Sequence, residues 1–247
     1  MTRLTTNLLD PAALAALNGE RDVVAAVRTP QEHPWVVGVV ASRPGVGATT
    51  TALGTATVLA ALRDDGVAVA GIRAADARLT TPIGHPPTRR LSDLGASVPG
   101  DVPTAAGVLV VGGPAAGHPM LDAELHNAVD VLTFGHRYLL FDIGDDRSDV
   151  GQAALACVDA VVLVTDSADQ VDPALDRILR AAPGVGGTTA AAIVGGRGVD
   201  RHRTVERLRG FDVTADRVVE VPGGPVRTAT RVAYLQLAAL LGAATRS

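Results

Sequence analysis

The stretch VVGVVASRPGVGATTT, residues 36–51, decides how the rest of this chain is interpreted. It starts with an apolar run typical of a buried β-strand, continues through a glycine-bearing turn, and ends where a helix begins. Glycines let backbone N–H groups approach an anion closely, and a helix N-terminus adds partial positive charge. The stretch therefore predicts a loop that binds phosphate.

The residue after the last glycine of this loop is Ala48. In a working P-loop a lysine at this point reaches the β- and γ-phosphates, and the next Ser or Thr holds Mg²⁺. Thr49 stands at the magnesium position, but all 22 basic residues of the chain are arginines, so no lysine elsewhere can replace the missing one. A GC-rich coding sequence accounts for a lysine-free surface, yet it does not explain alanine where arginine was equally available.

Composition narrows the class of protein. The 247 residues are 47% apolar but only 2% aromatic, so the core must be built from Val, Leu, Ile and Ala, which favours parallel strands covered by helices. The net charge of −4 argues against a chain-wide nucleic-acid surface. A single cysteine, Cys157, fits a reducing compartment, and neither a signal peptide nor a membrane span is recognisable. We expect a cytoplasmic protein without stable membrane insertion.

Apolar strands and helical stretches alternate after residue 34. The predicted strands lie near residues 35–41, 67–72, 107–111, 137–142, 159–165, 188–194 and 217–221. The predicted helices lie near residues 49–63, 120–134, 149–157, 173–181, 201–209 and 226–242. This alternation implies right-handed crossovers and a doubly wound α/β fold, with a mostly parallel sheet of about seven strands and helices on both faces. Sites in such sheets lie outside the carboxyl ends of the strands.

Residues 1–33 are expected to form an N-terminal helical extension of the main domain at 34–247. Asp10-Pro11 is a helix start, Asn18-Gly19 a predicted stop, and a second short helix is expected over 22–27. We favour a small helical lid on the main domain over a partner-binding arm.

The run RYLLFDIG, residues 137–144, carries the second chemical signal. A hydrophobic strand ending in Asp142 fits the carboxylate that positions Mg²⁺ in P-loop enzymes. A strand-end aspartate can also simply cap the next turn. Its place after a glycine loop favours the metal role.

Together with DAVVLVTD at 159–166, these segments resemble the MinD/ParA superfamily of deviant Walker-A P-loop ATPases over most of residues 35–247. That family's loop reads roughly Lys-Gly-Gly-x-Gly-Lys-Thr-Thr. The resemblance implies that the protein binds ATP or ADP together with Mg²⁺, and that Thr49 and Asp142 hold the metal. It implies a nucleotide-binding run made of Arg43, Pro44, Gly45, Val46, Gly47, Ala48, Thr49 and Thr50. Arg43 falls on the signature lysine, which in relatives reaches the partner's phosphates across a homodimer, and a guanidinium suits that role.

Other positions depart from the family pattern. Relatives end the second strand in an Asp-x-Asp-like switch, whereas GIRAAD at 71–76 places Arg and Ala there, and Asp76 serves only after a register shift. Where relatives carry an adenine-reading Asn, this chain has Gly195-Gly196-Arg197. Losing the lysine's charged hydrogen bond weakens triphosphate binding by roughly one to two powers of ten. Losing a transition-state cation slows hydrolysis by about 10³–10⁵.

The pattern therefore resembles the degenerate, lysine-less branch found in pilus-assembly and some actinobacterial secretion-associated proteins, and the arginine-rich composition suits an actinobacterial source. Three functions stay open. The first is a pseudo-ATPase that positions or recruits partners in secretion, pilus assembly, septum placement or partitioning, at the membrane only through those partners. The second is an active ATPase that uses Arg43 in place of the lysine. The third is a nucleotide-independent interaction protein.

Two further features receive the plainer interpretation. The arginines between 197 and 209 are expected to form a solvated helix face rather than a nucleic-acid contact. The amphipathic segment 226–241 lacks a basic polar face and is expected to pack on the core as the last helix rather than on a membrane.

Overall fold

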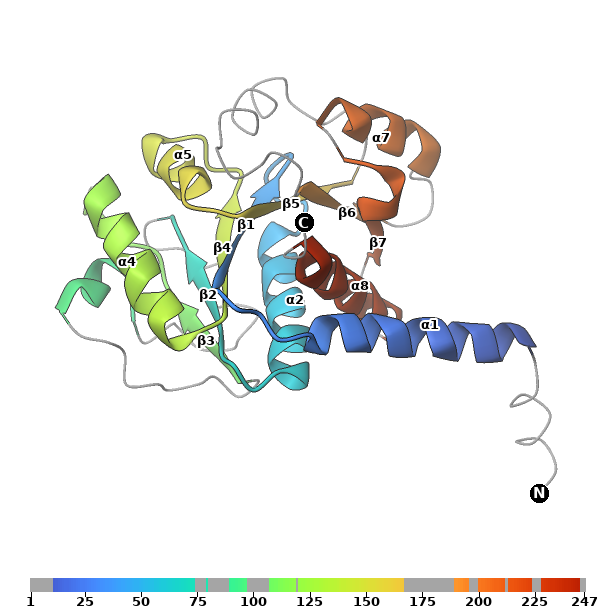
Figure 1. The fold of residues 1–247 in the computed structure, drawn as a ribbon. Coiled ribbons are helices and arrows are strands. Elements are labelled where there is room, and N and C mark those ends of the chain that lie inside the picture. Colours follow the sequence, from blue (N-terminus) through green and yellow to red (C-terminus); the bar gives the residue numbers. More distant parts are fainter. Residues whose placement is uncertain are drawn as a thin grey trace.

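A seven-stranded parallel sheet runs through the molecule in the order β3-β2-β4-β1-β5-β6-β7 (Figure 1). The computed structural model describes residues 11–73, 79, 89–96, 107–118, 120–166, 189–195, 200–211, 213–223 and 228–244. The strands are β1 Trp35–Ala41, β2 Val67–Gly71, β3 Val108–Val111, β4 Tyr138–Gly144, β5 Ala160–Thr165, β6 Thr189–Gly195 and β7 Val218–Pro222. The predicted α/β fold with seven parallel strands is confirmed, with strand ends shifted by one or two residues.

The first strand occupies the point where the winding of the sheet reverses. Its neighbours are β4 on one side and β5 on the other, and Val39 lies opposite both Asp142 and Val162. The chain crosses to β2 and β3 in one direction and to β6 and β7 in the other. Such a switch point opens a crevice at the carboxyl ends of the strands, which places the end of β1 at the expected position of a site.

Helices cover both faces of the sheet (Figure 1). The helices are α1 Pro11–Arg28, α2 Ala48–Leu62, α4 Asp122–Gly135, α5 Asp149–Ala156, α7 Arg201–Leu208 and α8 Thr228–Ala244, with 3-10 turns η2 Leu91–Ala96, η4 Arg209–Phe211 and η5 Ala215–Arg217. One apolar layer joins the sheet to α1, α2 and α8, and the other joins it to α4, α5, α7 and η2. The predicted helix at 173–181 lies outside the described residues. None of the described helices is both long and apolar enough to cross a membrane.

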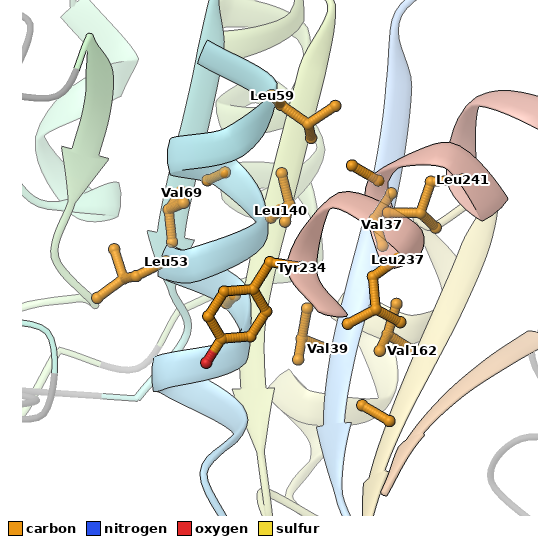
Figure 2. Packing of buried hydrophobic residues seen from close by; sticks show 14 of the residues in the cluster. Val37, Val39, Leu53, Leu59, Val69, Leu140, Val162, Tyr234, Leu237 and Leu241 are labelled. Atoms are coloured by element: carbon orange, nitrogen blue, oxygen red, sulfur yellow. The ribbon is translucent and has the colours of Figure 1, made fainter. Parts of the chain in front are cut away.

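The final helix lies on the core, as expected for its segment. Leu237 and Leu241 of α8 are buried between α8 and the sheet, in the apolar layer that contains Val37 and Val162 (Figure 2). Tyr234 lies over α2 at Gly54, where an added Cβ would come within 2.2 Å of the tyrosine ring. The missing side chain of Gly54 therefore lets the two helices pack closely.

The N-terminal segment corrects one prediction. Residues 11–28 form one continuous helix, α1, so Asn18-Gly19 does not end it and there is no second short helix over 22–27. A glycine inside a helix costs only about 1 kcal/mol relative to alanine. Burial of Val27 and hydrogen bonds from Arg63 to the carbonyls of Val27 and Thr29, at 2.6 and 2.7 Å, hold the end of α1 against the core. The domain division between residues 33 and 34 stays a prediction.

Candidate functional site

The glycine loop connects β1 to α2 at the carboxyl edge of the sheet. The Ser42 amide still donates to the carbonyl of Val164, at 2.9 Å, and the chain then leaves β5. Gly45 and Gly47 have φ angles of +76° and +103°, which side-chain-bearing residues rarely adopt. A Cβ on Gly45 would meet nothing within 4 Å. The loop is thus shaped by backbone conformations that only glycine adopts easily, and it borders open space.

Helix α2 begins directly after this loop without a capping side chain. Its N-cap is Gly47, and its first turn contains no acidic residue. The first amides of a helix have no intrahelical acceptor, and they carry partial positive charge. This helix end therefore presents donors to an anion without a carboxylate of its own in the way.

Thr49 and Asp142 meet beneath the loop although 93 positions separate them in the sequence. The Thr49 hydroxyl donates to Oδ2 of Asp142 at 2.6 Å, and the carboxylate is only 3% exposed, near the end of β4. A hydroxyl and a carboxylate in this arrangement fit Mg²⁺, which in P-loop enzymes bridges the β- and γ-phosphates. The other coordination positions would belong to phosphate oxygens and water.

The side chain at position 48 has no group able to contact phosphate. Ala48 is the first residue of α2, and its methyl group is 6% exposed within the apolar layer that includes Val46 and Ala52. The backbone therefore has the shape of a phosphate loop, whereas the lysine side chain that reads the β- and γ-phosphates in a working P-loop is absent.

Arg43 is engaged within its own chain. Its Nε donates to Oδ1 of Asp166 at 3.2 Å, Nη2 pairs with Oδ2 of the same carboxylate, and Nη1 donates to the carbonyl of Pro44 at 3.3 Å. The hydrogen bond and charge of Asp166, just past β5, raise the pKa of Arg43 further above its ordinary value. The guanidinium that aligns with the family's signature lysine is therefore held by an internal carboxylate.

A second arginine, Arg73, lies on the other side of Asp142 from Arg43, because β2 and β1 flank the strand that carries Asp142. Arg73, just past β2, donates from Nη1 to Oδ1 of Asp145 at 2.7 Å. Its backbone fits closely against Gly113, where an added Cβ would come within 1.8 Å of the Arg73 carbonyl oxygen. Close packing of the backbone at the ends of β2 and β3 therefore fixes the position of the Arg73 main chain.

The turn after β4 supplies a third arginine. Arg147 donates from Nη2 to the carbonyl of Ala41, the last residue of β1, at 2.7 Å, and from Nη1 to the carbonyl of Asp146. Sequence reasoning missed both Asp145 and Arg147. The run Asp145-Asp146-Arg147, directly after the predicted metal-binding strand end, is the signal that could have identified them.

Three of the predicted positions, Asp76, Gly196 and Arg197, lie outside the described residues. In α7 and η4, Arg207 and Arg209 are exposed, and Arg209 pairs with Glu206 at 2.5 Å, as expected for a solvated helix face.

A glycine loop at the switch point of a parallel sheet, leading into a helix above a buried strand-end carboxylate, defines the P-loop class of nucleotide-binding folds. Within that class, the solved structures that share this fold include ParA/MinD-family ATPases. No protein-family model matches the chain, and no curated protein matches it in sequence.

Three solved structures illustrate the likeness. Cobyrinic acid a,c-diamide synthase from Mycobacterium smegmatis aligns with a TM-score of 0.60 at 17% identity, over 83% of this chain and 92% of that one. A plasmid partition protein from Borrelia burgdorferi aligns at 0.58 and 15% identity, over 83% and 97%. The MinC:MinD cell division complex of Aquifex aeolicus aligns at 0.57 and 16% identity, over 86% and 95%. Identities this low establish a shared fold and not a shared activity.

Proposed function

We propose that this protein is a regulatory or positioning module of the ParA/MinD type that binds MgATP or MgADP weakly and hydrolyses ATP slowly or not at all. It works through dimerisation and recruitment of protein partners in a secretion, pilus, division or partitioning system. The lysine-less loop makes it a pseudo-ATPase of this fold.

The pairing of Thr49 with Asp142 beneath an uncapped glycine loop carries the proposal. In P-loop enzymes a threonine hydroxyl and a strand-end carboxylate hold Mg²⁺, so the 2.6 Å contact between Thr49 and Asp142 supports a retained metal-binding half of the site. Related folds have been crystallised with ADP and magnesium, and with an ATP analogue and magnesium. The residues assigned to nucleotide are Arg43 to Thr50, and those assigned to metal are Thr49 and Asp142.

Slow hydrolysis is expected because the site lacks a free positive charge at the two positions where the family has lysine. Ala48 offers no charge to the transferring phosphoryl group, and Arg43 is bound in two places to Asp166. Stabilisation of transition-state charge by a cation is worth about 10³–10⁵ in rate where an arginine finger supplies it. Because Arg43 is paired with Asp166 and position 48 has no charge, we expect the site to keep some nucleotide affinity but to lose most of its rate of ATP hydrolysis.

If ATP hydrolysis is slow or absent, the remaining activity that we propose for this fold is the recruitment of protein partners. A MinD protein with this architecture has been solved in complex with MinC. We extend that mode of action to this chain as a homodimer that presents a nucleotide-dependent surface to a protein partner.

Calorimetry with MgATP and MgADP tests the proposal on wild type, on Ala48→Lys and on a matched control, Ala61→Lys. Ala61 is exposed near the opposite end of α2, so its lysine makes the same chemical change in the same helix but away from the glycine loop. We expect weak or undetectable binding by wild type, tighter binding by Ala48→Lys by about 10- to 100-fold, and little change for Ala61→Lys.

Each alternative function makes a different prediction in these experiments. Fast magnesium-dependent ATP turnover by wild type, abolished in Arg43→Ala, would replace the proposal by an active ATPase. No binding or thermal shift with any nucleotide, in wild type and Ala48→Lys alike, would leave a nucleotide-independent interaction protein.

A further inference from the structure

We propose that Arg73 is the cation that replaces the missing lysine, and that it exchanges Asp145 for the terminal phosphate of a bound nucleoside triphosphate. This inference rests on the proposed function. It assigns to the β2 edge of the site the ability to distinguish a triphosphate from a diphosphate.

The sheet register places Arg73 beside the metal-binding side of the site. Gly71 lies opposite Asp142 in the pairing of β2 with β4, and Arg73 follows two residues later. Adjacent strands lie about 4.8 Å apart, so Arg73 follows the end of the strand that neighbours Asp142, the proposed metal ligand. A magnesium ion held by Thr49 and Asp142 would draw the terminal phosphate of a bound triphosphate toward this carboxylate. That phosphate would then lie on the side of the loop where Arg73 is.

Asp145 acts as an internal substitute for that phosphate. A guanidinium binds carboxylate and phosphate oxygens with the same charge-assisted geometry, and the Arg73–Asp145 contact of 2.7 Å has it. The pair is partly buried, with the Arg73 side chain 34% exposed and the Asp145 side chain 16% exposed. Arg73 makes a single hydrogen bond to Asp145, and a phosphate oxygen would replace it with an equivalent charge-assisted bond, so exchange of one anion for another costs little.

The other two arginines of the site are less suited to this exchange. Arg43 already makes three hydrogen bonds, two of them to Asp166. Arg147 donates to the Ala41 and Asp146 carbonyls, and withdrawing it removes a donor from the end of β1. Arg73 uses one of its five N–H donors on Asp145. Its main chain is fixed against Gly113, so the side chain can turn while the backbone stays in place.

Calorimetric titration with MgATP and MgADP tests this assignment on wild type, Arg73→Gln, Arg73→Lys and Asp145→Asn. Arg209→Gln is the matched control, because it removes an arginine from an exposed ion pair with Glu206 on α7 and η4. We expect Arg73→Gln to lose about 10- to 100-fold in MgATP affinity and much less in MgADP affinity. Arg73→Lys should retain part of the preference for triphosphate.

Asp145→Asn should have the opposite effect. Without the competing carboxylate we expect MgATP to bind about two- to fivefold more tightly, which is the range for loss of one partly exposed ion pair. If wild type is silent, MgATP binding gained by Asp145→Asn would support the inference on its own. Arg209→Gln should leave both affinities unchanged, and melting temperatures close to wild type would show that the variants are folded.

Two results would overturn the inference. One is binding by wild type that Arg73→Gln leaves unchanged, or weakens equally for MgATP and MgADP; this removes the role of Arg73 and leaves the proposed function standing. The other is an absence of binding in wild type, Ala48→Lys and Asp145→Asn alike, which removes both.

Discussion

The first turn of α2 faces the glycine loop and Asp142, whereas the following turns pack against α8 and the sheet (Figure 2). The packed part relies on apolar side chains and on the close approach of Tyr234 to Gly54. The first turn has uncapped amides, a left-handed glycine at its N-cap and charged neighbours. One helix therefore serves stability along most of its length, and the proposed function places ligand binding at its beginning. Substitutions in the two parts should have separable effects.

The largest loss of stability is expected in the packed part. Leu237 is 0% exposed between α8 and the sheet, so Leu237→Ala should destabilise the protein by about 2–5 kcal/mol. Chemical denaturation measures the loss. MgADP affinity, measured where the variant is folded, should be unchanged; a specific loss of affinity would contradict the separation of the two parts.

Gly54→Ala comes next, with an expected cost of about 1–3 kcal/mol from overpacking. The new methyl group would overlap the ring of Tyr234, which lies 2.2 Å from its position. The same substitution in a Tyr234→Ala background tests the cause. Without the tyrosine ring there is no clash, and alanine is a better helix former than glycine by about 1 kcal/mol. In that background Gly54→Ala should therefore stabilise the protein instead of destabilising it.

The glycine loop should respond to backbone strain. At φ +103° an alanine is strained, so Gly47→Ala should cost about 1–2 kcal/mol although its Cβ would meet nothing closer than 3.8 Å. Gly19→Ala is the matched control. Gly19 lies inside α1 with open space around it, and there the same change should stabilise by about 0.5–1 kcal/mol. Destabilisation by Gly19→Ala would contradict a continuous α1.

The smallest effect on stability is expected at the rim of the site. Arg43→Gln removes the partly exposed pair with Asp166, and ion pairs with this much solvent contact contribute little, so the melting temperature should change only slightly. Nucleotide affinity should change less than in Arg73→Gln. A larger loss of affinity for Arg43→Gln would move the phosphate-reading role to Arg43.

Much of the fold could be predicted from the sequence because its information is local. Apolar runs of strand length, a glycine turn and helix-length segments each occupy contiguous residues, and the structure confirms the parallel sheet they predict. The Thr49–Asp142 contact was also within reach, since both residues end or begin elements whose order fixes their place at one edge. The course of α1 was missed because its stability depends on contacts with Arg63 and α8, and not on its own Asn18-Gly19.

The sequence alone determined the class of fold, the glycine loop, and the absence of lysine from it. Local backbone preference and burial are written in neighbouring residues, so these features need no knowledge of distant contacts. Only the tertiary structure decided which arginine faces which carboxylate. The partners in Arg73–Asp145 and Arg43–Asp166 are 72 and 123 positions apart, and nothing in a run of arginines and aspartates specifies such pairs. They are set by strand order, because the ends of β2, β4, β1 and β5 lie side by side at one edge of the sheet.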